Sequence, residues 1–197
     1  MKKVEETDGP LSVVKKAGYQ TLLNYWENGG NKPSTSFAKA ALMELAEGFK
    51  MENCVFQKDV LDAMFRQVYS EESLAFSDNK IPGVLYATHY NLGRNGFAYF
   101  DGDVATYHVS TGNFTAWNSG WAYRNDAVDI EPCQDNIHTN GFNVGWINEG
   151  EWMEYDIEVD STAVYDVELR MATAGFEGAF HLEADGGRIS GLKYVPS

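Results

Sequence analysis

The hydrophobic pattern of this 197-residue chain changes about a third of the way along. Before residue 70, apolar residues recur at three- and four-residue spacing, which is typical of amphipathic helices. After residue 81, short runs alternate apolar and polar residues between turns rich in Gly, Asn and Asp, which is typical of half-buried strands. Side chains repeat every 3.6 residues in a helix and every two in a strand, so one kind of element cannot hold both patterns. We therefore expect a helical segment followed by a β domain.

Three helices are expected in the first 70 residues. Segments 36–50 and 58–69 each carry one apolar face, and Ser34 stands among the cap candidates before the first of them. Segment 11–26 is expected to be helical as well, and the run NGGNKP at 28–33 ends it. No strand is therefore expected before residue 70, only these three short helices and the segments that join them.

The second part reads as a set of short antiparallel strands. Residues 153–159 and 164–171 alternate apolar and polar side chains, and each run is expected to form a strand. The polar segment 71–80 is expected to be a linker. The resulting fold class is mainly β, an antiparallel β-sandwich with an N-terminal α-helical segment, and the expected divisions are 1–70, 71–80 and 81–197.

The charge of the chain excludes several classes of partner. Its net charge is −14, of which residues 1–80 contribute −2 and residues 81–197 contribute −12. Such a charge repels phosphate backbones and anionic lipid, so neither nucleic acid nor a membrane surface is an expected partner. The apolar runs are also too short to span a bilayer. Neutral ligands remain open.

Three motifs occur in order in the second part: YRNDAVDIEP at 123–132, GFNVGW at 141–146 and GEWMEY at 150–155. Further segments that belong with them are IPG at 81–83, GFAY at 96–99 and FHLEADG at 180–186. Together they resemble a family 6 carbohydrate-binding module over most of residues 81–197. The resemblance implies a β-jelly-roll sandwich that binds polysaccharide or oligosaccharide and performs no chemistry itself.

The resemblance also implies a set of binding residues. Sugar rings lie with their axial hydrogens against aromatic planes, and their hydroxyls need amide or carboxylate partners. Tyr123 stands where the family keeps a sugar-stacking aromatic residue. The expected carbohydrate-binding residues are Tyr123, Trp121, Trp117, Asn118 and Asn125.

Core packing is the competing interpretation for the aromatic residues. Trp121 and Tyr123 also suit the closed end of a sandwich, so their role stays open at this point. Trp146 and Trp152 lie inside the strand motifs, where alternate residues point inward, and core packing is expected for both.

Two departures from the family pattern limit what the resemblance implies. The family carries calcium-binding glutamates at the positions of Tyr86 and Thr88, and neither hydroxyl replaces an anionic oxygen ligand. No structural calcium, and no other cofactor or metal, is therefore expected. The chain ends with GLKYVPS at 191–197, where the family continues into a loop with a second stacking tryptophan and two strands. The module is expected to be incomplete at its C-terminus.

The helical part has a fainter resemblance of its own. The runs LNYWE at 23–27 and AALMELA at 40–46 look like the C-terminal helical end of a family 5-like glycoside hydrolase catalytic domain. The implied partner is the rest of that catalytic domain in a longer parent protein. No secretory signal pattern follows Met1, and an extracellular or secreted location is expected for the parent protein.

Glycosidase chemistry is not expected of this chain alone. Retaining glycosidases hold two carboxylates about 5 Å apart at the ends of barrel strands, and those strands are missing from the pattern. The four histidines show no metal-ligand spacing, so no catalytic and no metal residue is assigned. The leading hypothesis is non-catalytic binding that targets an associated glycoside hydrolase to β-linked glycans. The alternatives are a fragment of an endo-glycanase of the cellulase or hemicellulase type, whose activity resides in residues outside this chain, and an inert remnant.

Overall fold

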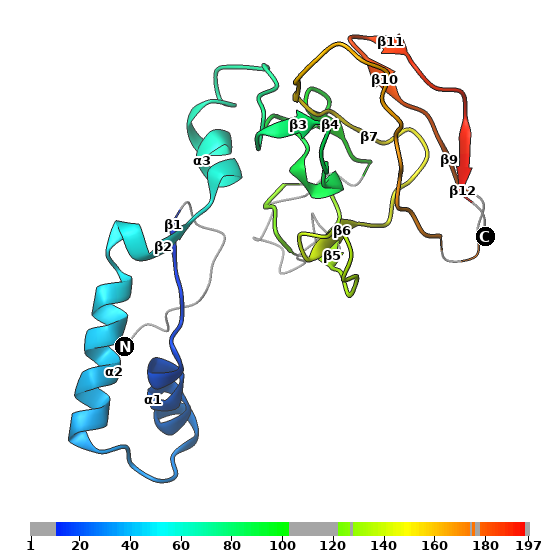
Figure 1. Ribbon diagram of the computed structural model, residues 1–197. Helices are drawn as coiled ribbons and strands as arrows, with labels where there is room; N and C mark the ends of the chain where they lie inside the picture. Colours follow the sequence, from blue (N-terminus) through cyan, green and yellow to red (C-terminus); the bar gives the residue numbers. More distant parts are fainter. Residues whose placement is uncertain (1–10, 103–121, 127, 174, 176–177, 196–197) are drawn as a thin grey trace. The chain divides into compact units, whose positions relative to one another are not determined.

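The computed structural model describes residues 11–102, 122–126, 128–173, 175 and 178–195 (Figure 1). The chain divides into two compact units, residues 1–160 and residues 161–197. The first unit holds all the helices among the described residues, followed by short strands. The second holds strands only.

The helical part of the first unit is built on one antiparallel strand pair and a helical hairpin. Strand β1 (Leu11–Val13) pairs with β2 (Cys54–Phe56). Helices α1 (Ala17–Asn28) and α2 (Thr35–Gly48) pack against each other and bury one apolar cluster between them (Figure 1). This cluster consists of Tyr19, Leu23 and Leu45, with Val13 packed against it.

The helices follow the apolar spacing closely. The helix expected over 36–50 is confirmed as α2, and its cap is Ser34, whose Oγ accepts a hydrogen bond from the backbone N–H of Phe37 at 3.2 Å. The helix expected over 58–69 is α3 (Lys58–Phe65), which stops earlier in a turn. A 3₁₀ turn, η1 (Met51–Asn53), precedes β2.

The helix expected over 11–26 was wrong in its first part. Leu11–Val13 forms strand β1, and the helix begins only at Ala17. Because β2 offers a partner backbone to this segment, its N–H and C=O groups are bonded across the two strands instead of within a helix. That partner lies about 40 residues further along the chain, beyond the reach of local spacing.

The β part consists of short strands in two-stranded pairs. In the first unit β3 runs parallel to β8, whereas β4 pairs with β7 and β5 with β6 in antiparallel fashion. In the second unit β9 pairs with β12 and β10 with β11, both antiparallel. The strands are β3 (Asn79–Ile81), β4 (Tyr99–Phe100), β5 (Ile130–Pro132), β6 (Phe142–Val144), β7 (Trp152–Met153), β8 (Ile157–Val159), β9 (Gly178–Phe180), β10 (Glu183–Ala184), β11 (Gly187–Arg188) and β12 (Lys193–Val195).

These pairs change the expected sheet architecture in two respects. One of them is parallel, so the strands are not purely antiparallel. Each sheet among the described residues has two strands, and a jelly-roll arrangement is not shown by them. The described secondary structure supports short β pairs preceded by three α-helices.

The strand expected over 164–171 was wrong, whereas that over 153–159 is shown in part. Residues 164–171 form no strand, and Val164 is 97% exposed. The run 153–159 contains the end of β7 and all of β8, separated by three residues outside either strand. Alternation produces a strand only where another strand bonds its backbone, and none of the described pairs includes 164–171.

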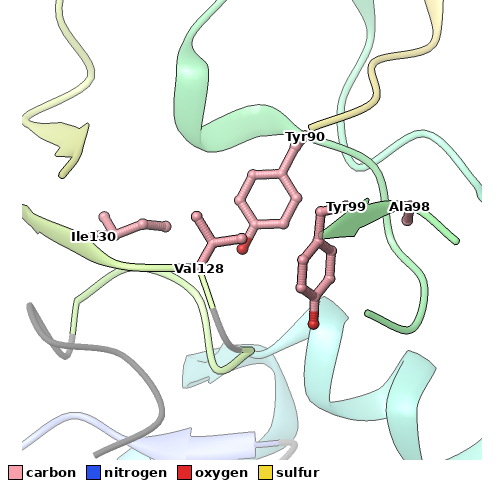
Figure 2. Packing of buried hydrophobic residues seen from close by; sticks show 5 residues of the cluster. All are labelled: Tyr90, Ala98, Tyr99, Val128 and Ile130. Atoms are coloured by element: carbon pink, nitrogen blue, oxygen red, sulfur yellow. The ribbon is translucent and has the colours of Figure 1, made fainter. Parts of the chain in front are cut away.

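A small aromatic and aliphatic core lies beneath the strands of the first unit. The rings of Tyr90 and Tyr99 meet edge to face with centroids 5.3 Å apart. Figure 2 shows these two rings beside the side chains of Val128 and Ile130, which come from a segment far along the chain. The buried members are Tyr90, Ala98, Tyr99, Val128 and Ile130.

The segment expected to be a linker is bonded to this β part. Leu74 and Leu92 exchange backbone hydrogen bonds of 3.0 and 2.7 Å, and Ser73 Oγ accepts one from Asn91 Nδ2 at 2.9 Å. Residues 71–80 thus belong to the first unit, while the domain boundaries at 70 and 81 stay a prediction. No helix among the described residues is long and apolar enough to cross a bilayer.

Candidate functional site

Two of the five expected binding residues lie within the described part of the chain. Tyr123 and Asn125 belong to the short described segment 122–126. Trp117, Asn118 and Trp121 fall outside the described residues, and their role stays a prediction.

Tyr123 lies at the surface on a group of aromatic rings. Its backbone has a φ of 66°, the left-handed region that non-glycine residues enter only when their surroundings hold them there. The side chain is 36% exposed. Its ring is stacked with that of His89, with an interplanar angle of 12° and centroids 5.8 Å apart, and it meets Phe142 at 4.8 Å and Phe76 at 6.0 Å. The ring is therefore held in place by its neighbours.

The hydroxyl of Tyr123 is bonded to the residues beneath it. Its oxygen lies 2.7 Å from His89 Nε2. Burial raises the pKa of the Tyr123 hydroxyl above its ordinary value, against the lowering effect of a hydrogen bond from Asn140. The phenol is therefore neutral at neutral pH.

Asn125 faces the start of helix α3. Its backbone N–H donates to Asp59 Oδ2 at 2.6 Å, and its side-chain Nδ2 donates to the same oxygen at 3.2 Å. A second acceptor, Gln57 Oε1, lies 3.5 Å from that nitrogen. The amide group expected to meet sugar hydroxyls is thus already bonded to the helical segment.

Arg124, between these two residues, anchors the loop in the core. Its guanidinium contacts the rings of Phe76 and Tyr90, with its central carbon 4.2 and 4.0 Å from their centroids. It pairs with Asp126 at 2.8 Å and with Asp59 at 3.8 Å. Burial raises the pKa of Asp126 above its ordinary value, and the charge of Arg124 opposes this. The hydroxyl of Tyr90 also donates to Asp126.

Tyr86 and Thr88, the positions of the family's calcium ligands, have other partners here. Thr88 is buried, and its Oγ1 accepts a hydrogen bond from Asn140 Nδ2 at 2.8 Å. The ring of Tyr86 meets His89 at 5.1 Å. The described residues contain no group of three or more His, Cys, Asp or Glu placed to hold a metal ion. The expectation about calcium stays a prediction.

The core interpretation of Trp146 and Trp152 was wrong. Their side chains are 53% and 42% exposed. Trp152 pairs across β4 and β7 with Phe100, itself 42% exposed, so both lie on an open face of this two-stranded sheet. A residue on the inward face of a strand is buried only where a second layer of structure covers that face. The side chains of Trp146 and Trp152 are not fully covered in this way.

Trp146 is the candidate binding residue that sequence reasoning missed. It follows β6 in a loop, and its φ of 49° is left-handed, as at Tyr123. A signal was present, because Gly145 before it and the run NEG at 148–150 after it are turn residues. Residues in such loops carry binding functions more often than residues inside strands do.

The comparisons with known proteins concern the same part of the chain. Residues 121–197 match the family model of the carbohydrate binding module (family 6). The searches of curated proteins and of solved structures gave no match. The match supports a family 6 carbohydrate-binding module there, and carbohydrate binding as the general class of function.

This family 6 segment, residues 121–197, includes Tyr123, Asn125 and Trp146. It leaves out the helical part, whose resemblance to a glycoside hydrolase stays a prediction. It begins after Trp117 and Asn118, so these two residues lie outside the match. Tyr123 and Phe142 of the aromatic cluster thus lie within the matched segment, whereas Phe76 and His89 lie outside it.

A cavity beside Trp152 does not serve as a sugar site. Its volume is about 30 Å³, and its walls include Phe100, Ile147 and Glu151. Small-molecule sites enclose roughly 300 Å³ or more, so a sugar ring does not fit. Among the described residues of the matched segment, Tyr123, Trp146 and Trp152 are aromatic side chains with exposed surface.

Proposed function

We propose that this chain binds polysaccharide without catalysis and targets an associated glycoside hydrolase to β-linked glycans. The family match over residues 121–197 carries the proposal. The exposed ring of Tyr123 supports it, because a neutral aromatic plane at the surface is what the axial hydrogens of a sugar ring pack against. The net charge of −14 also suits a neutral glycan better than an anionic polymer.

The proposed site contains Tyr123, Trp121, Trp117, Asn118 and Asn125, and Trp146 joins it because of its exposure. The proposed setting is a jelly-roll sandwich without structural calcium, in a parent protein that acts outside the cell. The glycoside hydrolase domain of that parent is the proposed partner. Binding relies on ring stacking and neutral hydrogen bonds, so added salt should weaken it little.

Affinity electrophoresis of the intact chain tests this function. Gels containing xylan, mixed-linkage β-glucan, a cellulose derivative or agarose-type galactan are compared with a gel without polysaccharide. We expect retardation in at least one of them. Migration that is the same in every gel, from a chain that unfolds cooperatively, would overturn the proposal. Release of reducing sugar at rates typical of glycosidases would favour the endo-glycanase alternative.

The Tyr123→Ala variant tests whether the chain binds polysaccharide through the proposed site. The variant should lose retardation and still unfold cooperatively, with a melting temperature lowered by about 3–8 °C, because two-thirds of the side chain is buried against His89, Phe76 and Phe142. Tyr69→Ala is the matched control, since Tyr69 is 90% exposed and lies outside the family 6 segment. Equal retardation of both variants would place the binding elsewhere.

A further inference from the structure

A chain of hydrogen bonds with one possible direction runs behind Tyr123. It begins at the backbone carbonyl of Asp156, which accepts from Asn79 Nδ2 at 3.1 Å. A carbonyl only accepts, so the amide nitrogen of Asn79 must face it and Asn79 Oδ1 must face the other way. That oxygen accepts the hydroxyl hydrogen of Ser77 at 2.9 Å.

The Ser77 hydroxyl decides which nitrogen of His89 carries the proton. Ser77 Oγ lies 2.9 Å from His89 Nδ1. A hydroxyl has a single hydrogen, and that hydrogen is directed at Asn79, so His89 Nδ1 must donate to Ser77. A neutral imidazole then has no hydrogen on Nε2.

Asn140 leads to the same conclusion from the other side of the ring. The backbone N–H of Phe142 donates to Asn140 Oδ1 at 3.2 Å, which turns Asn140 Nδ2 towards Thr88 and His89. That amide nitrogen lies 3.3 Å from His89 Nε2 and also bonds to Thr88 and to the Tyr123 hydroxyl. An amide nitrogen cannot accept a hydrogen bond, so Asn140 offers no acceptor to a hydrogen on Nε2, in agreement with the state that Ser77 requires.

The state of His89 fixes the role of the Tyr123 hydroxyl. A bare Nε2 at 2.7 Å can only accept, so the phenol hydrogen of Tyr123 points inward to His89. The phenol oxygen is then left with lone pairs only. Towards solvent it accepts hydrogen bonds and donates none.

We propose that His89 is a positioning residue of the carbohydrate site, which holds the Tyr123 ring and makes its oxygen an acceptor for a sugar hydroxyl. This inference rests on the proposed function. It adds a selection rule, because a glycan that presents a hydroxyl hydrogen to this oxygen is bound, whereas one that presents only an ether oxygen there is disfavoured. Burial and the charge of Arg124 lower the pKa of His89, which keeps the ring neutral.

The tautomer of His89 can be measured without any ligand. In the ¹⁵N-labelled full chain, long-range ¹H–¹⁵N correlation spectra distinguish a protonated from a bare imidazole nitrogen. The His89 signals are identified as those that disappear from the spectrum of the His89→Gln variant. We expect a proton on Nδ1 and none on Nε2. A proton on Nε2 at neutral pH would overturn the inference whatever the chain binds.

The affinity test uses the polysaccharide that retards the wild-type chain. His89→Phe keeps a planar ring and removes the acceptor, so binding should weaken about fivefold, the worth of one net hydrogen bond. Tyr123→Phe should weaken binding by at least as much, and adding His89→Phe to it should cost little more, because the shared bond is already lost. If the double variant loses affinity by the product of the two single-variant factors, the two side chains act independently and the coupling is contradicted.

Two further variants separate positioning from folding. His89→Gln offers an amide oxygen as acceptor and should recover most of the affinity lost in His89→Phe, with melting temperatures followed for both. His181→Phe is the control, because His181 belongs to the second unit and makes its polar contact with Glu183, at 2.8 Å. If His89→Gln binds no better than His89→Phe, the inference is overturned. A wild-type chain retarded by no glycan would overturn the proposed function instead, while the tautomer spectrum still decides the geometry.

Discussion

At the scale of single residues, Arg124 is the side chain on which most of the loop 122–126 depends. It is 3% exposed, donates to the backbone carbonyls of Tyr90 and Asn91 at 2.7 and 3.3 Å, and balances the charge of Asp126. Removing one partner of a buried ion pair leaves the other charge without compensation. The loop that carries Tyr123 is therefore tied to the core through its neighbour.

Arg124→Met should lower the free energy of unfolding by about 3–5 kcal/mol, because Asp126 is left buried without its cation. Urea unfolding followed by tryptophan fluorescence measures the change. Arg94→Met is the control, since Arg94 and its partner Glu71 are 43% and 63% exposed, and about 0.5 kcal/mol or less is expected there. Equal losses in both variants would show that the Arg124 network adds nothing.

The lowered pKa of His89 gives a pH dependence of known sign. The charged and titratable groups around the ring are the Arg124 guanidinium, the Tyr123 hydroxyl and the phenol of Tyr86. The folded state holds the proton of His89 less tightly than the unfolded state does. Neutral His89 therefore makes its full contribution to the unfolding free energy above its ordinary pKa of 6.5. That contribution is lost as the pH falls below 6.5 through the lowered pKa of the folded state.

Urea unfolding of the wild type and of His89→Gln is measured over pH 4.5–8. Both proteins have the same carboxylates, so the difference between them isolates the contribution of His89. The difference in unfolding free energy between the two should be constant above about pH 6.5 and should shift against the wild type below it. A difference that grows in favour of the wild type on acidification would mean that the pKa of His89 is raised, contrary to its burial.

At the scale of elements, apolar spacing and caps located the helices well, and the strands poorly. Helix α2 begins beside the cap Ser34, a signal that lies within four residues of the helix start. The pairing of β3 with β8 joins Asn79 to Ile157, nearly 80 residues apart, and no local signal specifies it. A helix closes its hydrogen bonds within one segment, whereas a strand needs a second one.

The turn after β3 depends on the absence of a side chain at Gly83. A Cβ built at this position would lie 2.4 Å from the backbone carbonyl oxygen of Lys80. Gly83→Ala should therefore cost about 1–3 kcal/mol of unfolding free energy, because backbone must move to make room. Urea unfolding measures the cost.

Gly145→Ala is the matched control for that variant. A Cβ there meets its nearest neighbours at 3.8 Å, which is ordinary van der Waals contact, and a change of about 0.5 kcal/mol or less is expected. A Gly83→Ala variant as stable as the Gly145→Ala variant would contradict the close approach in the turn.

At the scale of the whole molecule, protection should differ between the two units. Asn91 N–H donates to the Glu154 carbonyl at 2.8 Å and Leu92 N–H to the Leu74 carbonyl at 2.7 Å, both beside the buried core. Residues 164–171 lie in the second unit, outside every described strand. Local opening is easiest where backbone groups are unpaired and side chains are exposed.

Hydrogen exchange of the intact chain, followed by mass spectrometry of peptides, tests this difference. Peptides from 164–169 should exchange faster than peptides covering 87–101, because 164–169 lies outside every described strand. Comparable protection of both would show that the backbone of 164–169 is hydrogen-bonded in solution. The helices α1 and α2 serve as an internal reference for protected backbone.

The sequence by itself determined the helices α2 and α3, the acidic charge of the β part and the family resemblance, because spacing, caps, charge and motifs are local properties. Only the tertiary structure decided that Tyr123 meets His89, 34 residues away, and that Asn125 is bonded to Asp59, 66 residues away. It also decided that Trp146 and Trp152 are exposed. Burial and long-range hydrogen bonds depend on which segments pack together, and that packing is a property of the folded chain as a whole.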